Sequence, residues 1–345
     1  MSFDEAGGWP GVLGQLSAGH DLAADVARAA MAEMLAGNAT DAQIAGFAVA
    51  LRMKGETIAE LRGLVEAMLA AAEPVELDDA GGPVVDIVGT GGDRSHTINV
   101  SSLAALVAAG AGARVCKHGN RAQSSSTGSA DLLEVLGVNI ECGPKEVARC
   151  VAEAGIGFCF APRFHPALRH VGPARRQLGI PTAFNFLGPL ANPARVRRYM
   201  IGVADAAMAE RMVGVLAERG CEHAIVVHGD DGLDELTVTT TSQVIELRDG
   251  AVTTYRVDPT DLGIELVERS ALTGGDPATN AALARKVLGG DLGPQRDIVC
   301  LNAGAGLVAA GLVADLAAGF AAAQASIDEG RAARSLDRLV EVSNA

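Results

Sequence analysis

Two glycine-containing turns hold most of the side chains that could bind an anion. The first, Gly89-Thr90-Gly91-Gly92-Asp93, follows an apolar, β-branched run at 84–88 and precedes Ser101-Ser102 at the predicted start of a helix. Glycine lets the backbone turn sharply, and the order strand, glycine turn, helix start presents free N–H groups to a phosphate. The pattern predicts a phosphate-binding turn, although a tight turn without chemical function has the same local sequence.

The second turn makes this interpretation more specific. Lys117-His118-Gly119-Asn120-Arg121 follows a strand predicted at 114–117, and the hydroxyl-rich segment 124–129 opens the next helix. A lysine supplies a point charge, and the loop supplies directional N–H and O–H donors. In open α/β sheets, ligands bind at the carboxyl ends of the strands. Alone, 124–129 would be a solvated loop with a serine N-cap; beside Lys117 we interpret it as part of the phosphate site.

The densest acidic run is Asp230-Asp231-Gly232-Leu233-Asp234-Glu235, just after an apolar strand predicted at 224–228. Most such runs are charged surface turns. Here the carboxylates would repel a polyphosphate unless a divalent cation lay between them, and carboxylates and hydroxyls are magnesium ligands. The run therefore predicts a magnesium site, with Ser101 as a further candidate ligand.

A third group mixes aromatic side chains with a few cations. It comprises 160–166, Arg175 and 184–190. This mixture suits a flat, partly apolar anion such as an aromatic carboxylate, which Arg175 would bind through paired N–H groups. By composition alone, the alternative remains open that the aromatic residues are core and the arginines face solvent.

The elements that must position these groups alternate from Val84 onward, which predicts an α/β sheet. We expect strands at 84–88, 114–117, 157–160, 199–203 and 224–228, and antiparallel strands within 237–257 around an Asp249-Gly250 turn. We expect helices at 101–110, 130–136, 144–154, 206–219, 277–288 and over much of 305–329, with a helix-like segment at 165–179.

The first 75 or so residues predict helices only. Thr40 with Gln43, and Thr57 with Glu60, have the spacing of capping boxes. The apolar residues that follow each box share one helical face: Ile44, Phe47, Ala48 and Leu51 in one helix, and Leu61, Leu64, Val65 and Met68 in the next. This segment predicts a small helical domain.

Composition narrows the function classes. The 345 residues carry a formal net charge of −14, which argues against nucleic acid or an anionic membrane as partner. The six cysteines form no C-x-x-C pair, so we expect small buried hydrophobic side chains of a reducing compartment. No export signal and no apolar stretch of membrane-spanning length is visible. We expect a cytoplasmic protein.

Four motifs, in this order and spacing, resemble the anthranilate phosphoribosyltransferase family: Gly89-Thr90-Gly91-Gly92-Asp93, Lys117-His118-Gly119-Asn120-Arg121, Phe184-Asn185-Phe186-Leu187-Gly188-Pro189-Leu190-Ala191-Asn192-Pro193 and Asp234-Glu235. The resemblance implies a small all-helical domain, 1–76 joined by a helical segment near 166–187. It also implies a larger α/β domain, 77–345, with a central, mostly parallel sheet of the nucleoside phosphorylase/phosphoribosyltransferase type. The implied activity is transfer of the phosphoribosyl group of 5-phosphoribosyl 1-pyrophosphate to anthranilate, with release of pyrophosphate, by a cytoplasmic homodimer in tryptophan biosynthesis.

The resemblance also implies roles for individual residues. Contacts to phosphoribosyl pyrophosphate would come from Gly89, Gly92, Asp93, Thr97, Asn99, Val100, Ser101, Ser102, Lys117, His118, Gly119, Asn120, Arg121, Ala122, Gln123, Ser124, Ser125 and Ser129. Gly89, Asn120 and Arg175 would line the anthranilate site, with His118 and Pro189 nearby. Ser101, Asp234 and Glu235 would hold two Mg²⁺ ions per monomer. No general base is assigned, because an aromatic amine is already neutral at pH 7.

Three other functions are weighed against this one. Pyrimidine nucleoside phosphorylases share the first turn but carry a Lys-Xaa-Ser-Thr-Gly-Gly type motif where this chain has Lys117-His118-Gly119-Asn120. A non-catalytic protein of this fold would bind phosphoribosyl pyrophosphate without turnover. A dinucleotide oxidoreductase is disfavoured, because Gly-Thr-Gly-Gly-Asp is not G-x-G-x-x-G.

Overall fold

The N-terminal part of the chain is a bundle of four helices, α1 (Gly8–Ser17), α2 (Ala24–Leu35), α3 (Asp41–Lys54) and α4 (Ile58–Ala70). The structure is a computed structural model that describes residues 2–78, 81–93, 95–122 and 126–345. Both predicted capping boxes are confirmed: the Thr40 and Thr57 side chains accept hydrogen bonds from the backbone N–H groups at the third helical positions. The predicted apolar faces of α3 and α4 are buried.

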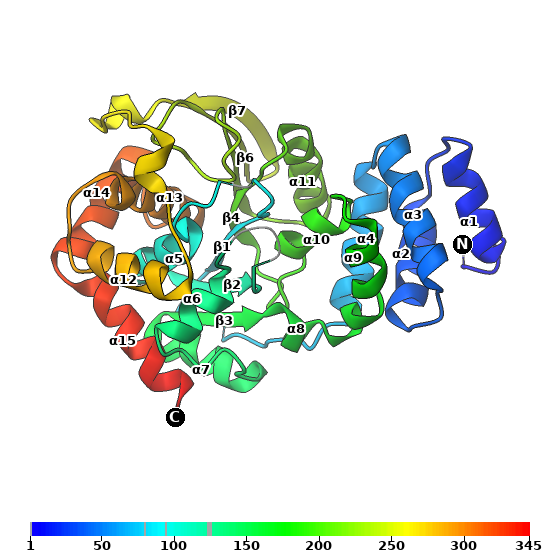
Figure 1. The fold of residues 1–345 in the computed structure, drawn as a ribbon, viewed down its shortest axis with the longest axis horizontal. Helices are drawn as coiled ribbons and strands as arrows, with labels where there is room; N and C mark the ends of the chain where they lie inside the picture. The colour runs from blue at the N-terminus through cyan, green and yellow to red at the C-terminus, as the bar shows by residue number, and fades with distance from the viewer. Residues whose placement is uncertain (1, 79–80, 94, 123–125) are drawn as a thin grey trace.

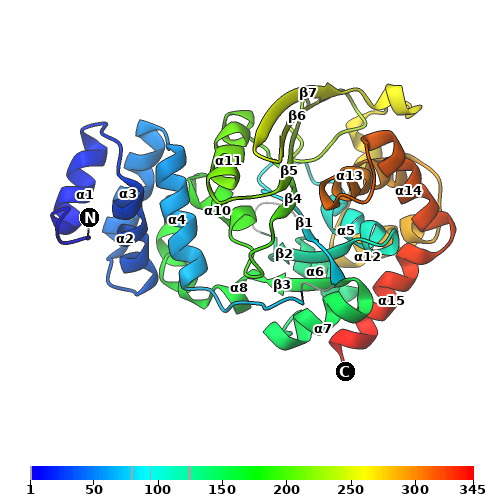
Figure 2. The ribbon, with the colours of Figure 1, turned by 180° about the vertical axis from the view of Figure 1, so that it is seen from behind.

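A segment distant in sequence packs against this bundle. The 3₁₀ helix η2 (Pro166–His170) contacts α2, and α9 (Gly172–Leu178) contacts α3. Figures 1 and 2 show α9 lying beside the bundle from both sides. The helix-like segment expected at 165–179 is therefore two short helices, and α10 (Phe184–Leu190) leads back to the sheet, where it contacts β2.

The α/β part is built on a seven-stranded sheet in the order β3-β2-β1-β4-β5-β6-β7. Its five parallel strands are β1 (Val84–Gly89), β2 (Arg114–Gly119), β3 (Ile156–Phe160), β4 (Arg198–Gly202) and β5 (His223–Gly229). The antiparallel pair β6 (Ser242–Arg248) and β7 (Ala251–Val257) turns at Asp249-Gly250, as predicted, whereas 237–241 is not strand. The chain builds outward from β1 to β3 and returns to β4 on the other side of β1, so the switch in strand order lies at β1.

Helices cover both faces of the sheet, and side chains alternate between them along each strand. Ile87 and Met200 pack with α5 (Val100–Gly110) and the C-terminal helices, whereas Val88 and Ile201 pack on the opposite face with α10, α11 (Ala206–Glu218) and α4. The remaining elements are α6 (Ser129–Val135), α7 (Pro144–Ala154), α8 (Ala161–Phe164), η3 (Pro259–Leu262), η4 (Arg269–Leu272), α12 (Pro277–Leu288), α13 (Pro294–Ala310), α14 (Leu316–Asp328) and α15 (Arg331–Ser343).

The helix expected over much of 305–329 is confirmed as helical, with an interruption that was not predicted. It is two helices, because Gly311 ends α13 at φ 76° and the Asp315 side chain caps α14 by accepting from the Ala318 N–H. The leading helix also begins at Pro294, since proline is favoured in the first turn. The continuous alanine-rich composition hid both boundaries.

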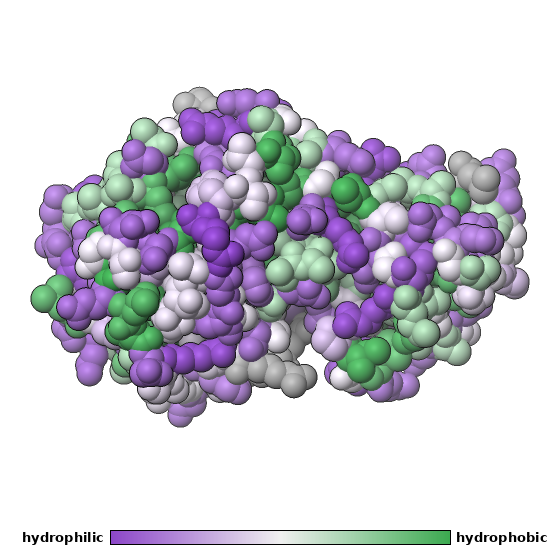
Figure 3. Space-filling view, turned by 90° about the horizontal axis from the view of Figure 1, so that it is seen from above, coloured by the Kyte–Doolittle hydropathy of each residue, from purple (hydrophilic) through white to green (hydrophobic). Residues whose placement is uncertain are grey.

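The predicted burial of the cysteines is confirmed: all six are free thiols and buried. Within the described residues, no helix combines the length and the apolar character needed to cross a membrane. Figure 3 shows polar side chains over most of one face of the molecule, with apolar residues in separate small patches.

Candidate active site

The acidic pair lies directly against the first glycine turn. The Gly91 N–H donates to Asp234 Oδ2 at 2.7 Å, and the Ser101 N–H donates to Glu235 Oε1 at 3.0 Å. Both carboxylates are therefore held by backbone groups more than 130 residues away in sequence. The structure brings together the three residues predicted as magnesium ligands, at the carboxyl end of β1.

The glycines of the first turn have two different roles. Gly91 and Gly92 have φ values of +68° and +86°, which L side chains rarely adopt. A Cβ atom on Gly89 would lie 2.5 Å from Asp234 Oδ2. The missing side chain at Gly89 therefore makes room for the carboxylate, a reason that the sequence analysis did not foresee.

The electrostatics of this cluster favour a cation. Burial, Asp93 and Glu235 together raise the pKa of Asp234 well above its ordinary value. Burial raises the pKa of Glu235 to about 8, with Lys117 opposing the shift. Glu235 Oε2 is buried and has no hydrogen-bond partner among the described residues. Carboxylates crowded in this way are stabilised in their charged form by a positive ion.

These residues fit a magnesium ion. Carboxylate and hydroxyl oxygens are its preferred ligands, and it commonly takes one or two carboxylates with substrate phosphates and waters completing the shell. Such a site needs fewer than three protein carboxylates, so it is compatible with the finding that no group of three or more His, Cys, Asp or Glu suited to a metal ion occurs in the described part of the chain. The orphaned oxygen of Glu235 is the observation that favours binding here.

Lys117 lies inside the cluster, below the turns. Its Nζ donates to the Ile87 carbonyl at 2.5 Å and to Ser101 Oγ at 3.3 Å, and its side chain is fully buried. Burial lowers its pKa, and the nearby carboxylates of Asp86, Glu235 and Asp234 oppose the shift. In this arrangement Lys117 is first of all the counter-ion of the buried carboxylates.

Asp86 and Asn192 complete the base of the site and were not predicted. The backbones of β1 and β2 pair at Val84–Arg114 and Val85–Val115. Beyond these pairs Asp86 Oδ1 accepts from the His118 N–H at 3.2 Å, and Asp86 Oδ2 accepts from Asn192 Nδ2 at 2.8 Å. Burial raises the pKa of Asp86 to about 6. An aspartate in the middle of an apolar strand was the available signal, because buried carboxylates are rare unless partnered.

A further missed segment, 273–280, ties the two turns together. Asn280 Nδ2 donates to Asn99 Oδ1 at 2.8 Å, and Asn99 Nδ2 donates to the Thr127 carbonyl at 2.9 Å. The Gly275 carbonyl accepts from Thr127 Oγ1, and its N–H donates to Asn280 Oδ1. Thr97 forms an isolated antiparallel bridge with Thr273. The sequence signal, two glycines before a helix, resembled an ordinary loop.

Other predicted phosphate contacts already have protein partners. The Arg121 guanidinium pairs with Asp131 and Glu134 at 2.9 and 2.8 Å, and the Ala122 N–H donates to Asp131 Oδ2. Ser129 Oγ donates to the Asn120 carbonyl at 3.3 Å. A side chain on Gly119 would collide with Ser129.

Two of the predicted phosphoribosyl pyrophosphate contacts, Val100 and Ser102, lie in α5, and three others lie outside the residues that the structure describes. Val100 and Ser102 are buried in the first turn of α5, and Ser102 Oγ has no hydrogen-bond partner among the described residues. Gln123, Ser124 and Ser125 lie outside the described residues.

The histidine of the second turn is neutral. Burial, with the neighbouring His165 adding to it, lowers the pKa of His118 to about 3. Its Nδ1 lies 3.0 Å from the Gly188 carbonyl, so Nδ1 carries the hydrogen and Nε2 is left as a buried acceptor without a partner among the described residues. The His118 ring therefore joins the end of β2 to α10, which also contains Pro189.

The Arg175 side chain has no carboxylate partner among the described residues. The guanidinium lies over the Phe184 ring, 5.5 Å from its centroid, and burial lowers its pKa. Within the described residues it has no ion pair of 4.0 Å or less. The alternative interpretation is confirmed for the aromatic side chains, which are buried core residues (Phe160, Phe164, Phe184 and Phe186), whereas Arg175 is half-buried and does not simply face solvent. A half-buried guanidinium stacked on an aromatic ring suits an aromatic carboxylate.

Two family models match the chain. A glycosyl transferase family helical bundle domain matches residues 10–72, and a glycosyl transferase family a/b domain matches residues 81–333. Together they span the helical bundle and the sheet described above.

Curated relatives and solved structures carry one name. The chain is 56% identical over 342 residues to an anthranilate phosphoribosyltransferase of Rhodococcus jostii, covering 97% of this chain and 93% of the relative. A crystal structure of the Thermus thermophilus enzyme of this name is 42% identical, with a TM-score of 0.91 over 97% of this chain and 99% of that one. The Saccharomyces cerevisiae enzyme, in complex with PRPP and Mg, is 28% identical with a TM-score of 0.89 over 97% and 98% of the two chains. With residues 10–72 and 81–333 matched by family models and relatives of this identity over nearly the whole length, the chain belongs to the glycosyl transferase family and, within it, to the anthranilate phosphoribosyltransferases.

Proposed function

We propose that this chain performs the reaction of its family at the carboxyl ends of β1 and β2. It transfers the phosphoribosyl group from 5-phosphoribosyl 1-pyrophosphate to anthranilate, giving N-(5-phosphoribosyl)anthranilate and pyrophosphate in tryptophan biosynthesis. The observation that carries the assignment is the contact of Asp234 with the first glycine turn at Gly91, and of Glu235 with the start of α5 at Ser101. The relatives solved with PRPP and Mg, and with 4-fluoroanthranilate, support the choice of ligands.

The main barrier is the charge that develops on the pyrophosphate leaving group while the sugar becomes oxocarbenium-like. Bound magnesium supplies Lewis-acid stabilisation of that charge. We propose that Ser101, Asp234 and Glu235 hold two such ions per monomer, with Asp93 adjoining. The Thr90 and Gly91 N–H groups already donate to the Gly202 carbonyl and to Asp234, so we propose that the N–H groups of Gly92 and Asp93 donate to the same charge, a preorganised arrangement that need not rearrange during the reaction.

The second turn would bind the remainder of the phosphoribosyl group. We propose contacts from Thr97, Asn99, Asn120 and the loop through Ser129, together with the three loop residues outside the description, Gln123, Ser124 and Ser125. The hydrogen bonds among Asn99, Thr127 and Asn280 fix the spacing of the two turns. Lys117 would act from below as a positive charge that opposes protonation of the buried carboxylates.

The anthranilate site would lie between Gly89, Asn120 and Arg175. Arg175 binds the carboxylate, which orients the amine toward C1 of the ribose, and positioning of this kind contributes much of the rate when the nucleophile is already neutral. His118 is held neutral and hydrogen-bonded to Gly188, so it shapes this side of the site and carries no charge.

A fluorescence assay tests the proposal. Purified protein with phosphoribosyl pyrophosphate should consume anthranilate, seen as loss of its fluorescence, only when Mg²⁺ is present. The double variant Asp234→Asn, Glu235→Gln should lose magnesium-dependent turnover and keep its fold by circular dichroism. Full activity in that variant would remove the metal assignment, and phosphate-dependent cleavage of thymidine by the wild type would favour a nucleoside phosphorylase.

We also propose that the protein is a cytoplasmic homodimer, and that its small domain comprises 1–76 with the segment near 166–187. The packing of α9 on α3 supports the discontinuous domain. Met53 on α3 and Ile180 after α9 are exposed apolar side chains of this part, which suits a protein contact. Light scattering should give twice the mass of one chain, and a monomer at micromolar concentration would contradict the dimer.

A further inference from the structure

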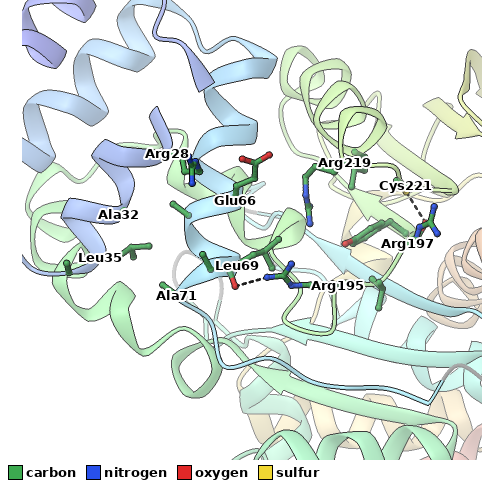
Figure 4. Close-up of a pocket in the computed structure, with 16 residues that line it drawn as sticks. Arg28, Ala32, Leu35, Glu66, Leu69, Ala71, Arg195, Arg197, Arg219 and Cys221 are labelled. Carbon is green, nitrogen blue, oxygen red and sulfur yellow. Dashed lines mark hydrogen bonds between the residues drawn. The ribbon is translucent and has the colours of Figure 1, made fainter. Parts of the chain in front are cut away.

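A second concave site lies away from the proposed active site. It has a volume of about 850 Å³ and opens where α2 and α4 face the start of β4 and the end of α11 (Figure 4). Small-molecule sites typically measure about 300–1,000 Å³. The site adjoins the amino end of β4, whereas the proposed active site lies at the carboxyl ends of β1 and β2. None of the residues assigned above to substrate or metal lines it.

We call this site the junction cavity and define it by Arg28, Leu35, Leu69, Arg195, Tyr199 and Arg219, which belong to its lining. Its charged side chains are mostly positive. The cavity is lined by four arginines and one acidic residue, Glu66, in a protein of net charge −14. A cluster of guanidinium groups of this kind needs a reason, and the partners of each group show which of them are free.

Two of the arginines, Arg195 and Arg219, keep N–H donors that no carboxylate of the described residues occupies. Arg219 Nη1 donates to the Leu190 carbonyl at 2.6 Å, and Arg195 Nη2 donates to the Leu69 carbonyl at 3.4 Å. Across the described ranges, neither has a carboxylate within 4.0 Å. Arg197, on the same rim, is already paired with Glu222 at 3.1 Å, and Arg28 is paired with Asp25 at 3.3 Å. Arg195 and Arg219 extend into the space between α4 and β4 (Figure 4), and each guanidinium keeps N–H donors for an anion.

The wall between them carries an unsatisfied donor. Tyr199 lines the cavity and is almost fully buried, and its hydroxyl hydrogen has no acceptor among the described residues, since the neighbouring Arg219 guanidinium can only donate to it. Burial raises the pKa of this hydroxyl, with the Arg219 guanidinium opposing the shift, so it stays protonated. Buried polar groups in native proteins are nearly always partnered, and an exception calls for an explanation. Arg195 also has a φ of +49°, unusual for a residue with a side chain, and such backbone strain concentrates at ligand sites.

We propose that the junction cavity binds a small organic anion, with a carboxylate or phosphate held by Arg195, Arg219 and the Tyr199 hydroxyl and an apolar body against Leu35 and Leu69. The apolar part of the lining also includes alanines of α2 and α4, so a bare inorganic ion would leave most of the cavity unfilled. Charge and shape together select an amphipathic ligand.

Occupation of the cavity reaches the proposed active site through two short connections. The Arg195 N–H donates to the Asn192 carbonyl at 2.9 Å, and the Asn192 side chain bonds Asp86, which accepts from the His118 N–H. Arg219 bonds the last residue of α10, the helix that holds His118 through Gly188. The anion therefore acts as an effector of the anthranilate side of the site. This second claim, unlike the binding itself, rests on the proposed function.

Calorimetry on the full chain tests the binding. The probes are 3-phenylpropionate and phenyl phosphate, with 3-phenylpropanamide as the uncharged match. At least one anion should bind at millimolar concentration or better, and the amide at least about tenfold more weakly, because hydrogen bonds to a charged group are the stronger ones. Binding by one anion and not the other identifies the head group. Failure of both anions to bind overturns the proposal.

Variants locate the binding. Tyr199→Phe and Arg219→Gln should each weaken it about tenfold. Tyr199→Phe should keep the fold, because the hydroxyl donates to no acceptor in the described part of the chain, and its melting temperature should not fall. Arg197→Gln is the matched control on the same rim and should bind as the wild type does. Unchanged affinity in Tyr199→Phe and Arg219→Gln, or loss of binding in Arg175→Ala, would place the anion elsewhere and overturn the proposal.

A kinetic arm tests the effector claim. Added at about its wild-type Kd, the anion that binds should change KM for anthranilate at least twofold in the wild type and by a much smaller factor in Tyr199→Phe. An equal change in both proteins would mean competition at the anthranilate site, and no change in either would mean a silent cavity; both results overturn the effector claim. Absence of any turnover would instead refute the proposed function, while calorimetry still decides whether the cavity binds.

Discussion

Removing the charge of Glu235 should stabilise the metal-free protein while it abolishes magnesium-dependent activity. Burial raises the pKa of this carboxyl from 4.5 to about 8. In the folded protein at pH 7 it must therefore take up a proton that the unfolded chain does not hold. The cost is about 1.4 kcal/mol for each pH unit above 4.5, or about 3 kcal/mol at pH 7. Glutamine has the same shape and avoids this cost.

The sign of the pH dependence follows from the direction of the shift. A raised carboxyl pKa favours folding below the ordinary pKa, and this contribution is lost as the pH rises from about 4.5 to 8. The stability gained by Glu235→Gln should thus be absent near pH 4, grow through neutrality and level off above pH 8. For a chain of this length, about 3 kcal/mol corresponds to about 4 °C in melting temperature at pH 7.

The assay is thermal unfolding in chelator from pH 4 to 9, followed by the same series with Mg²⁺ and phosphoribosyl pyrophosphate. In the second series the order should reverse, because ligand binding stabilises only the wild type. Glu268→Gln, at an exposed position, is the control and should match the wild type in both series. Equal melting temperatures of Glu235→Gln and wild type at every pH in chelator would refute the reasoning.

Three further predictions concern the neighbours of this pair. Arg175→Ala should raise KM for anthranilate about 10- to 100-fold and leave KM for phosphoribosyl pyrophosphate unchanged in steady-state kinetics, because a charge-assisted hydrogen bond is worth about 1.5–3 kcal/mol; equal losses for both substrates would contradict its role. Gly89→Ala should raise the Mg²⁺ concentration that turnover requires, because its Cβ would lie 2.5 Å from Asp234 Oδ2. Gly14→Ala, whose Cβ would have nothing within 4 Å, should leave that concentration unchanged. Asn280→Ala removes the hydrogen-bond partners of the Gly275 N–H and of Asn99 Oδ1, so it should lower the free energy of unfolding by about 2 kcal/mol in denaturant unfolding. It should also raise KM for phosphoribosyl pyrophosphate more than KM for anthranilate. A change confined to anthranilate would show that 273–280 does not set the spacing of the turns.

The local elements followed from the sequence, because their causes are local. The capping boxes at Thr40 and Thr57 need only two residues three positions apart, and the β-branched run at 84–88 predicts a strand by composition. The two phosphate-type turns were visible for the same reason. Helix boundaries within the alanine-rich C-terminal region were missed, since alanine alone marks neither a start nor an end.

The chemistry at the base of the site depended on tertiary structure. The sequence determined that Asp234, Glu235, Ser101 and two glycine turns exist at family-specific positions. Only the folded chain shows that Gly89 is glycine to admit a carboxylate, and that Lys117 is buried beneath the cluster. These facts arise from contacts between strands far apart in sequence, and burial sets the pKa values that follow from them. The same holds for Asn280 and for the junction cavity, whose residues come from α2, α4, β4 and α11 and share no local pattern.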